Sequence, residues 1–411
     1  SRGEFDVVTV VPPLGVTVHV CEMHADLKRM ICRHKSFQVD SAFPDTADSA
    51  DVYEAVASPL VKDVLNGGIG VLFMYGQTGS GKTFTMEAIE RRTAYDLLPG
   101  DDDVDSEDSF LEPEIAVTAA YFEIAGKRCT DLLSPTPREV VIKEFTDPTG
   151  RAQVDLLGAV EPRVTSAKEL LALIASGKER RATSSTAANA TSSRSHAVLR
   201  LSVLRVDADD GCVEGQITLV DCAGSERKTD NMYHDATQRK EGAEINASLY
   251  ALKECVRLRR LRALGERAHI PYRNSCLTRV IMPCLMRDDA GIVVIGTLSP
   301  SAADTEHSVA TLKTVLLIGG NDNATPMETK EDVPKGLSWD GDGVVRNHVV
   351  KRAIPPGQWA YADIVAWLAR VKGGAFAGGH VPEGLSGREL VRMTPHALAR
   401  LLPPAARRGH H

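Results

Sequence analysis

The sequence lacks a hydrophobic run long enough to cross a membrane, and it lacks the charged-then-apolar opening of a secretory signal. No stretch of its 411 residues approaches the ~18 consecutive apolar residues of a membrane helix. A membrane partner is therefore not predicted. The first residue is Ser1 rather than Met, so we expect a fragment or a processed chain.

The sequence also lacks any Cys-x-x-Cys pair. Such spacing is what zinc ribbons and dithiol redox motifs need, so both are poorly supported. The simpler interpretation, which we favour, is reduced thiols in a cytoplasmic protein. The eight scattered cysteines are Cys21, Cys32, Cys129, Cys212, Cys222, Cys255, Cys276 and Cys284.

An excess of positive charge is missing as well. Lys and Arg number 48 against 55 Asp and Glu, so the net charge is −7. Such a chain does not hold nucleic acid through bulk charge, and a polyanionic partner would need a local basic patch. No internal repeat and no heptad run is visible, so neither a solenoid nor a coiled coil is predicted. At ~150 residues per domain, the length predicts two to three domains.

Five apolar runs alternate with helical patterns over the first three quarters of the chain. This alternation predicts an α/β fold with a central sheet covered by helices on both faces. The runs are Gly70–Tyr75, Ile115–Ile124, Ala197–Leu204, Gln216–Val220 and Gly291–Leu298, and the clearest helical patterns are Ala167–Ser176 and Glu241–Arg262.

Three further segments differ from this pattern. Asp101–Asp108 is an acidic tract, which predicts a solvated surface loop. Gly319–Gly343 is polar and rich in Gly, Pro and Asp, which predicts a linker. Pro355–Leu402 returns to helical apolar spacing and predicts a small all-helical module.

The most specific motif is G-x-x-x-x-G-K-[ST], which follows an apolar strand and opens a helix. Its members are Gly76, Gln77, Thr78, Gly79, Ser80, Gly81, Lys82 and Thr83. Glycines allow backbone N–H groups to close around phosphate oxygens, Lys82 would neutralise the β- and γ-phosphates, and Thr83 would ligate Mg²⁺. The alternative, a glycine turn that binds nothing, has little support because every fixed position matches.

Two more segments indicate to which class of nucleotide-binding protein the chain belongs. Asn189–His196 (NATSSRSH) gathers hydroxyls around Arg194 just before an apolar strand. Asp221–Arg227 (DCAGSER) places Asp221 at the end of another strand, where a Walker B carboxylate holds Mg²⁺. Alone, the first segment could equally be a polar loop that caps a secondary element.

Together, GQTGSGKT, NATSSRSH and DCAGSE resemble the kinesin motor domain, as P-loop, switch I and switch II. The similarity extends through Tyr121–Leu133, Glu241–Cys255 and His269–Thr278, and covers about Phe5 to Leu317. It implies a P-loop NTPase fold with a central mixed sheet flanked by helices, and it implies ATP, Mg²⁺ and microtubules as cofactors and partner. The stretch VHVCEMHADLKRMICRHKSFQVDSAF is most like the internal-motor, microtubule-depolymerising subfamily.

The resemblance also implies residue roles. Ser192, Ser193 and Ser195 would line the γ-phosphate and the lytic water, with Ser193 nearest Mg²⁺ or the water. Arg194 would pair with Glu226 when the switches close, and Gly224 would sense the γ-phosphate through its amide. Asp221 would hold Mg²⁺, Phe84 could stack on the base or belong to the core, and Asn246 would tie the switch II helix to the closed state.

Residues 257–279 form a basic stripe, although the chain as a whole has a net negative charge. It carries seven arginines and one acid, Glu266, in the stretch that corresponds to the filament-facing element of kinesins. We expect it to contact the acidic tubulin surface, although a solvated helix face is the alternative. The arginines are Arg257, Arg259, Arg260, Arg262, Arg267, Arg273 and Arg279.

Four departures from the family bear on function. The family's first strand and its R-x-R-P adenine contact have no counterpart, and the loop after the P-loop helix is short. The Lys-Val-Asp tip of the depolymerising subfamily is His24-Ala25-Asp26 here, and Cys276 replaces the lysine of S-K-L-T.

Two hypotheses for the function follow: an ATPase that acts on microtubule ends or lattice, and a kinesin-derived structural protein of a microtubule assembly with weak or no ATPase. Either would place the protein in the cytoplasm, on the cytoskeleton.

We expect a motor domain over residues 1–318 without its first strand, a linker over 319–354 and a helical module over 355–411. The module resembles a sterile alpha motif, and we expect its last helix to be missing or incomplete. Ile364, Trp367, Leu368 and Val371 share one helical face in it. Such a module would self-associate or recruit a protein. The alternative is a helical appendage packed on the motor.

Overall fold

The computed structural model describes residues 6–23, 30–99, 114–187, 194–206, 212–225, 236–319, 325–332, 360–370 and 381–393. The chain divides into two compact units, residues 1–21 with 32–330 and residues 22–31 with 331–411. No helix within the described ranges is long and apolar enough to cross a membrane.

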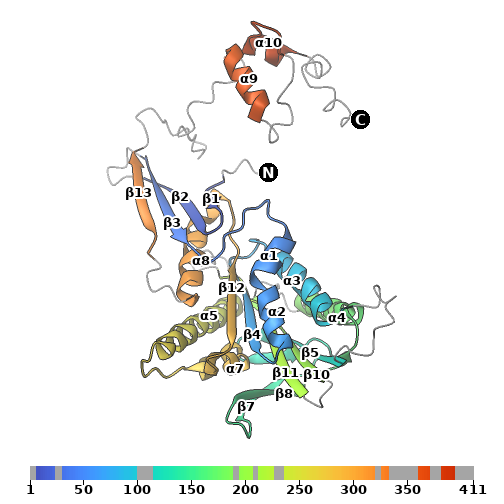
Figure 1. The fold of residues 1–411 in the computed structure, drawn as a ribbon. Helices are drawn as coiled ribbons and strands as arrows, with labels where there is room; N and C mark the ends of the chain where they lie inside the picture. The colour runs from blue at the N-terminus through green and yellow to red at the C-terminus, as the bar shows by residue number, and fades with distance from the viewer. Residues whose placement is uncertain are drawn as a thin grey trace. The chain divides into compact units, whose positions relative to one another are not determined.

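A mixed seven-stranded sheet forms the centre of the first unit (Figure 1). Its strand order is β12-β4-β11-β10-β5-β6, with β9 paired to β5. β12 and β11 are parallel to β4, and the remaining pairs are antiparallel. The strands are β4 (Ile69–Tyr75), β5 (Glu114–Ala125), β6 (Arg128–Asp131), β9 (Arg163–Val164), β10 (His196–Val206), β11 (Cys212–Asp221) and β12 (Gly291–Gly296). The predicted α/β class and all five predicted strands are confirmed.

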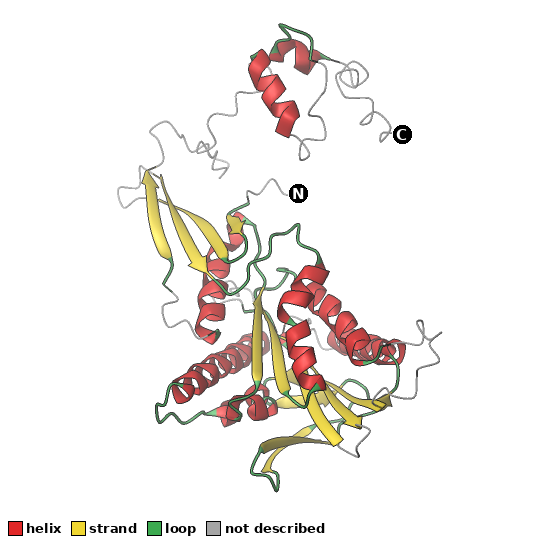
Figure 2. Cartoon of the chain, viewed as in Figure 1, coloured by secondary structure: helices red, strands yellow, loops and turns green. Residues whose placement is uncertain are grey.

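Alternate residues of a strand point to opposite faces of the sheet, and consecutive residues of β4 are apolar and buried, so both faces are apolar. In β4, Val71 and Phe73 pack in one core cluster, and Leu72 and Met74 pack in the other. Helices cover both faces (Figure 2). One cluster faces α1 (Ser49–Val56), α2 (Ser58–Leu65), α3 (Lys82–Leu97) and α4 (Ala167–Ala187), and the other faces α5 (Ala236–Ala263), α6 (Cys276–Val280) and α7 (Met282–Met286).

A second, four-stranded sheet has the order β1-β2-β3-β13. Its strands are β1 (Val8–Val11), β2 (Gly15–Met23), β3 (Met30–Gln38) and β13 (Met327–Asp332), and its inner face packs on α8 (Thr305–Ile318). β13 corrects the prediction that Gly319–Gly343 is only a linker: residues 327–330 add to β3, where Arg33 and Glu328 form an ion pair at 2.7 Å.

A two-stranded ribbon of β7 (Val141–Thr146) and β8 (Ala152–Leu157) packs against the α5 side of the sheet. Short 3-10 turns at Tyr272–Asn274 and Ala302–Asp304 precede α6 and α8. The acidic tract Asp101–Asp108 lies outside the described residues.

The second unit contains α9 (Tyr361–Arg370) and α10 (Gly387–Arg392). Ile364, Val381, Leu385 and Leu390 form its small core. Ser386 caps α10 through a reciprocal capping box with Glu389. The helical character expected for this segment is confirmed over these residues. Trp367, expected on the apolar face, is 38% exposed, and the side chains of Leu368 and Val371 lie outside the described part.

Candidate functional site

The phosphate-binding motif forms the turn between β4 and α3. Gly76, Gly79 and Gly81 have φ values of 157°, 80° and 99°. A Cβ at Gly76 would lie 2.5 Å from the carbonyl oxygen of Thr297, so this position has room only for glycine. The strand–turn–helix context that the motif requires is therefore present, and the loop brings Gly76 to Thr83 together in one short segment.

Lys82 begins α3 and holds its charge over this loop. Its Nζ donates hydrogen bonds to the carbonyl oxygens of Gly76 at 3.0 Å and Gln77 at 2.7 Å. The residue is only 8% exposed. An ammonium group and a helix N-terminus at the same point create a positive site that fits phosphate.

Thr83 and Asp221 meet where α3 begins and β11 ends. The Thr83 hydroxyl donates to Asp221 Oδ2 at 2.8 Å. Asp221 Oδ1 is buried and has no hydrogen-bond partner among the described residues. A buried carboxylate oxygen without a donor suits a cation or a cation-bound water. The predicted magnesium residues Thr83 and Asp221 thus lie side by side, and their donor set fits Mg²⁺.

The tips of the two switch segments fall partly outside the described residues. Ser192, Ser193 and Glu226 are among the residues left out, so their predicted roles and the Arg194–Glu226 pair stay predictions. Arg194 is half-buried at the start of β10, and Gly224 is buried just after β11. The amide of Ser225, next to Gly224, donates to the carbonyl of Gly76 at 3.1 Å, which joins this segment to the phosphate loop.

A chain of hydrogen bonds through His196 connects three elements. The Ala223 amide donates to His196 Nδ1 at 3.2 Å, so Nδ1 is the accepting nitrogen. Nε2 then carries the proton and donates to Ser248 Oγ at 2.7 Å. Ser248 in turn donates to the Ile245 carbonyl at 2.7 Å. One tautomer therefore satisfies the chain from the end of β11 through β10 to α5.

The surroundings of His196 keep its imidazole neutral. Burial, followed by the charge of Arg181, lowers the pKa of His196 to about 4. The neutral form is what the hydrogen bonds require, because a proton on Nδ1 would face the Ala223 N–H. Asn246, expected to tie this helix to the closed state, lies two residues before Ser248 in α5.

Arg181 of α4 joins the first switch segment to the magnesium pair. Its guanidinium lies 3.8 Å from Asp221 Oδ2 and donates to the Ser195 carbonyl at 2.8 Å. The Ser195 hydroxyl donates to Glu123 and is contacted by Arg181 at 3.3 Å. Ser195, expected to line the γ-phosphate, thus has partners on β5 and α4.

Sequence reasoning missed Arg181, Glu123 and Ser248, and it gave His196 no role. His196 closes the NATSSRSH motif, so the motif itself was a signal for it. Glu123 lies in Tyr121–Leu133, a segment that carries part of the resemblance, whereas Arg181 lies in no such segment. Glu123 comes close only because β5 pairs with β10 in a register that sets it opposite Ala197.

A half-buried lysine connects the two helices behind the loop. Lys178 of α4 forms ion pairs with Glu90 at 2.7 Å and Glu87 at 3.1 Å, both on α3. Glu90 is 5% exposed, and burial raises its pKa against the opposing effect of Lys178. These ion pairs connect α4, which precedes the first switch segment, to the helix that starts at Lys82.

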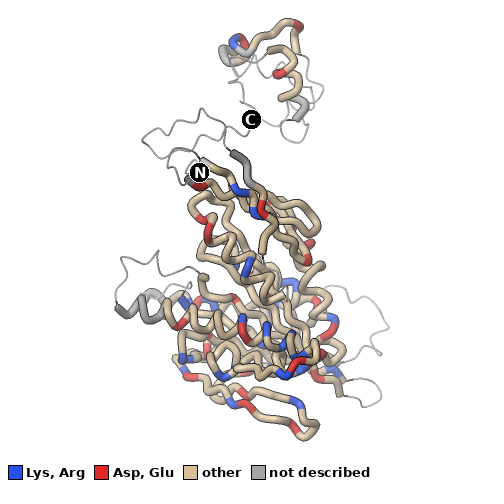
Figure 3. Tube along the Cα trace, turned by 90° about the vertical axis from the view of Figure 1, so that its left-hand side faces the viewer, with Lys and Arg blue, Asp and Glu red and all other residues tan. Residues whose placement is uncertain are grey.

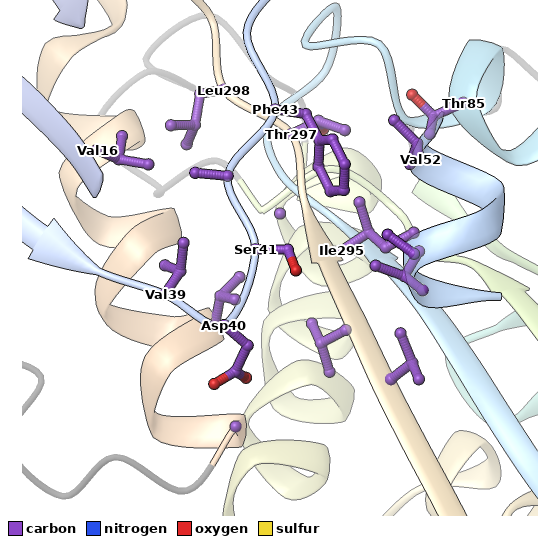
Figure 4. A pocket seen from close by; sticks show the side chains of 18 of the residues that line it. Val16, Val39, Asp40, Ser41, Phe43, Val52, Thr85, Ile295, Thr297 and Leu298 are labelled. Atoms are coloured by element: carbon purple, nitrogen blue, oxygen red, sulfur yellow. The ribbon is translucent and has the colours of Figure 1, made fainter. Parts of the chain in front are cut away.

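A cavity of about 1220 Å³ lies between the phosphate loop, α1, β12 and the small sheet. Figure 4 shows Phe43, Thr297 and Thr85 around it. Phe84 also lines it and is 73% exposed, so the core alternative for Phe84 is wrong and the ring is accessible to a nucleotide base. β12 is the terminal strand of the described sheet, and its residues form one wall of the cavity.

The seven arginines of the basic stripe do not form one uniform surface. Three donate inward. Arg259 binds the carbonyls of residues 287, 288 and 290, Arg262 binds the Met286 carbonyl and Asp288, and Arg279 binds Glu144 and the Ile142 carbonyl.

Of the other four, Arg257 pairs with Glu254 at 2.7 Å, and Arg273 stacks over Tyr272 at 5.0 Å. Arg257, Arg267 and Arg273 are exposed, whereas Arg260 is half-buried. Basic and acidic residues are interspersed over the body of the molecule (Figure 3). The stripe counted along the sequence is therefore reduced to a few exposed cations, and its role in filament binding stays a prediction.

Comparisons with known proteins agree with this geometry. The family model "Kinesin motor domain" matches residues 8–314. "Diatom spindle kinesin-1" of Cylindrotheca fusiformis is 36% identical over 300 residues, which is 72% of this chain and 45% of that protein, so the chain spans about half the length of this curated relative. A solved structure described as "Structure of a fast kinesin: Implications for ATPase mechanism and interactions with microtubules" superposes with a TM-score of 0.63 at 25% identity, covering 85% of this chain and 93% of that one.

Proposed function

The chain belongs to the kinesin motor family, and from that premise we propose that it is an ATP-hydrolysing motor that acts on microtubules. Members of this family bind ATP or ADP with Mg²⁺ and are microtubule-stimulated ATPases. The observation that carries the proposal for this chain is the Thr83–Asp221 contact beside Lys82, in which one carboxylate oxygen has no donor among the described residues.

The site residues would promote phosphoryl transfer by positioning the reactants and by stabilising negative charge. Lys82 and the amides of the glycine loop would bind the phosphates, and Thr83 and Asp221 would hold Mg²⁺. When bound, Mg²⁺ neutralises negative charge on the phosphates. Ser193, Arg194 and Glu226 are proposed to position the lytic water once the switches close. Gly224 is proposed to report on the γ-phosphate through its amide.

Movement would pass from this site to the filament through α5. Ser225 bonds to Gly76, and His196 connects Ala223 to Ser248 on α5. A closing switch segment would therefore pull on a 28-residue helix whose distal end carries Arg257. We propose that Arg257, Arg267 and Arg273, which are exposed, make the filament contacts.

A depolymerising type of action, in the cytoplasm on microtubule ends, is the finer proposal. Its support is the resemblance of the segment around β2 and β3 to the depolymerising subfamily. His24-Ala25-Asp26 is a departure within that segment and lies outside the described residues. The module of residues 355–411 is proposed to be a sterile alpha motif-like element for self-association or recruitment, separated from the motor by the segment around 319–354.

One observation favours a second candidate, a structural microtubule protein with weak or no ATPase. Arg259, Arg262 and Arg279 are engaged inside the protein, which leaves fewer cations for a filament than the sequence suggests. Weak stimulation by microtubules would follow from weak binding.

A microtubule-stimulated ATPase assay on the full chain tests the proposal. We expect turnover that rises with microtubule concentration and falls to background in Lys82→Ala. Arg194→Ala should still bind nucleotide yet lose turnover, and Arg205→Ala, remote from the loop, is the matched control. Nucleotide binding without stimulation in the unaltered chain would favour the structural candidate, and absence of nucleotide binding would refute both the site and the motor.

A further inference from the structure

Two cysteines on the small sheet face each other across neighbouring strands. Cys21 on β2 and Cys32 on β3 have Sγ atoms 3.9 Å apart. Both are reduced; Cys21 is exposed and Cys32 is buried. The two rungs before them are also side-chain pairs, Thr17 with Ser36 at 2.9 Å and His19 with His34 at 2.7 Å. Three successive pairs of this kind place the cysteines in one continuous antiparallel ladder.

The register of that ladder suits a disulfide. The Val39 amide donates to the Leu14 carbonyl at 2.9 Å, so Leu14 and Val39 form a hydrogen-bonded pair. Because the two pair types alternate along the strands, Cys21 and Cys32 fall on a non-hydrogen-bonded pair. In such pairs the two α-carbons lie about 4.5 Å apart, inside the roughly 4.4–6.8 Å that a disulfide spans.

The neighbouring histidines raise the alternative of a metal site. No three His, Cys, Asp or Glu side chains converge on a point that could hold a metal ion anywhere in the described ranges. The two sulfur atoms, in contrast, are already close enough to bond after small side-chain rotations. The arrangement therefore favours chemistry between the cysteines themselves.

We propose that Cys21 and Cys32 are a hydroperoxide-sensitive modification site that closes to an intrachain disulfide. Cys21, the exposed thiol, attacks one peroxide oxygen as its thiolate. The O–O bond breaks, Cys21 becomes a sulfenic acid, and the hydroxide leaves as water with the thiol proton. Cys32 then attacks the Cys21 sulfur and expels the hydroxyl group as a second water. Two thiols are oxidised and one hydrogen peroxide is reduced to two waters.

The bond would tie together the two strands on either side of residues 24–29. This is the segment that carries the departure His24-Ala25-Asp26. Neither cysteine belongs to the phosphate loop or lines the cavity beside it. Nucleotide binding is therefore expected to be the same in the oxidised and the reduced protein.

Peptide mapping of the full chain tests the site. The reduced protein is treated with hydrogen peroxide, its remaining thiols are alkylated under denaturing conditions, and it is digested with trypsin without reduction. Cleavage after Arg2, Lys28, Arg29 and Arg33 separates residues 3–28, with Cys21, from residues 30–33, with Cys32. We expect these peptides as one species, two hydrogens lighter than their sum, that separates on reduction.

Variants make the test specific. Cys32→Ser should lose the linked species completely, and its Cys21 should instead trap as sulfenic acid. Cys21→Ser, a mild change at an exposed position, should also lose the link. Cys212→Ser, which removes another exposed thiol, should keep the link at the level of the unaltered chain. The proposal is overturned if both peptides remain separate and alkylated after peroxide treatment.

Discussion

Replacing His196 should change how the stability of the motor unit depends on pH. The folded protein holds this imidazole neutral, with a pKa of about 4, against an ordinary value of 6.5. The unfolded chain therefore binds more protons between these values. Stability from this residue is complete above about pH 6.5 and is lost as the pH falls toward about 4.

The magnitude follows from the two pKa values. Between about pH 7 and about pH 5, the preference of the unfolded chain for the proton removes about 2 kcal/mol from the free energy of unfolding. His196→Asn keeps an acceptor for the Ala223 amide, and His196→Gln keeps a donor for Ser248, but neither variant titrates. Both should therefore unfold with a pH dependence that is shallower by about 2 kcal/mol over this range.

Urea unfolding at the two pH values, followed by far-UV circular dichroism, measures this difference. His269→Asn, at an exposed position, is the matched control and should keep the slope of the unaltered protein. Both His196 variants should also lose stability at about pH 7, since each leaves one buried partner unpaired at a cost of about 1–3 kcal/mol. If the His196 variants keep the full slope, the assignment of Nδ1 as acceptor in a neutral ring is wrong.

The remaining predictions concern the phosphate loop, the pair behind it and the filament surface. Gly76→Ala should abolish nucleotide binding, measured by fluorescent-nucleotide titration, because its Cβ would clash with the Thr297 carbonyl; wild-type affinity would contradict the loop geometry. Lys178→Ala should lower the free energy of unfolding by roughly 3 kcal/mol because it leaves Glu90 buried without its cation, and an unchanged urea midpoint would show that the pair does not stabilise the fold. Arg267→Ala should lower the affinity for microtubules in co-sedimentation and should make that affinity less dependent on salt. If the affinity of the unaltered protein does not depend on salt, the exposed arginines do not make the filament contacts.

Local features of the site could be predicted from the sequence, and features built by strand pairing could not. The phosphate loop is formed by consecutive residues, so the chemistry of Gly76 to Thr83 can be predicted without knowing the rest of the fold. The Thr83–Asp221 contact was also predictable, because both residues follow or precede recognisable strand and helix patterns. Glu123 lies in a segment that resembles the family, but its place beside Ser195 depends on the pairing of β5 with β10.

The small sheet shows the same limit. Gly319–Gly343 has the composition of a linker, and composition cannot show that residues 327–330 find an open strand edge at β3. Cys21 and Cys32 are eleven positions apart, a spacing with no meaning for a motif. They meet because a hairpin sets its register by backbone hydrogen bonds, such as the one between Val39 and Leu14.

The arginine stripe shows why a charge count along the chain predicts partners poorly. The count over 257–279 includes only acids within that stretch, but a guanidinium finds its partner in space. Arg279 reaches Glu144 on β7, and Arg262 reaches Asp288 beyond α7, so neither acid enters the count. Arg259 donates to three backbone carbonyls, so its guanidinium is engaged within the fold, and burial lowers its pKa. A surface that attracts an acidic filament must therefore be sought among the cations left exposed after these partners are assigned.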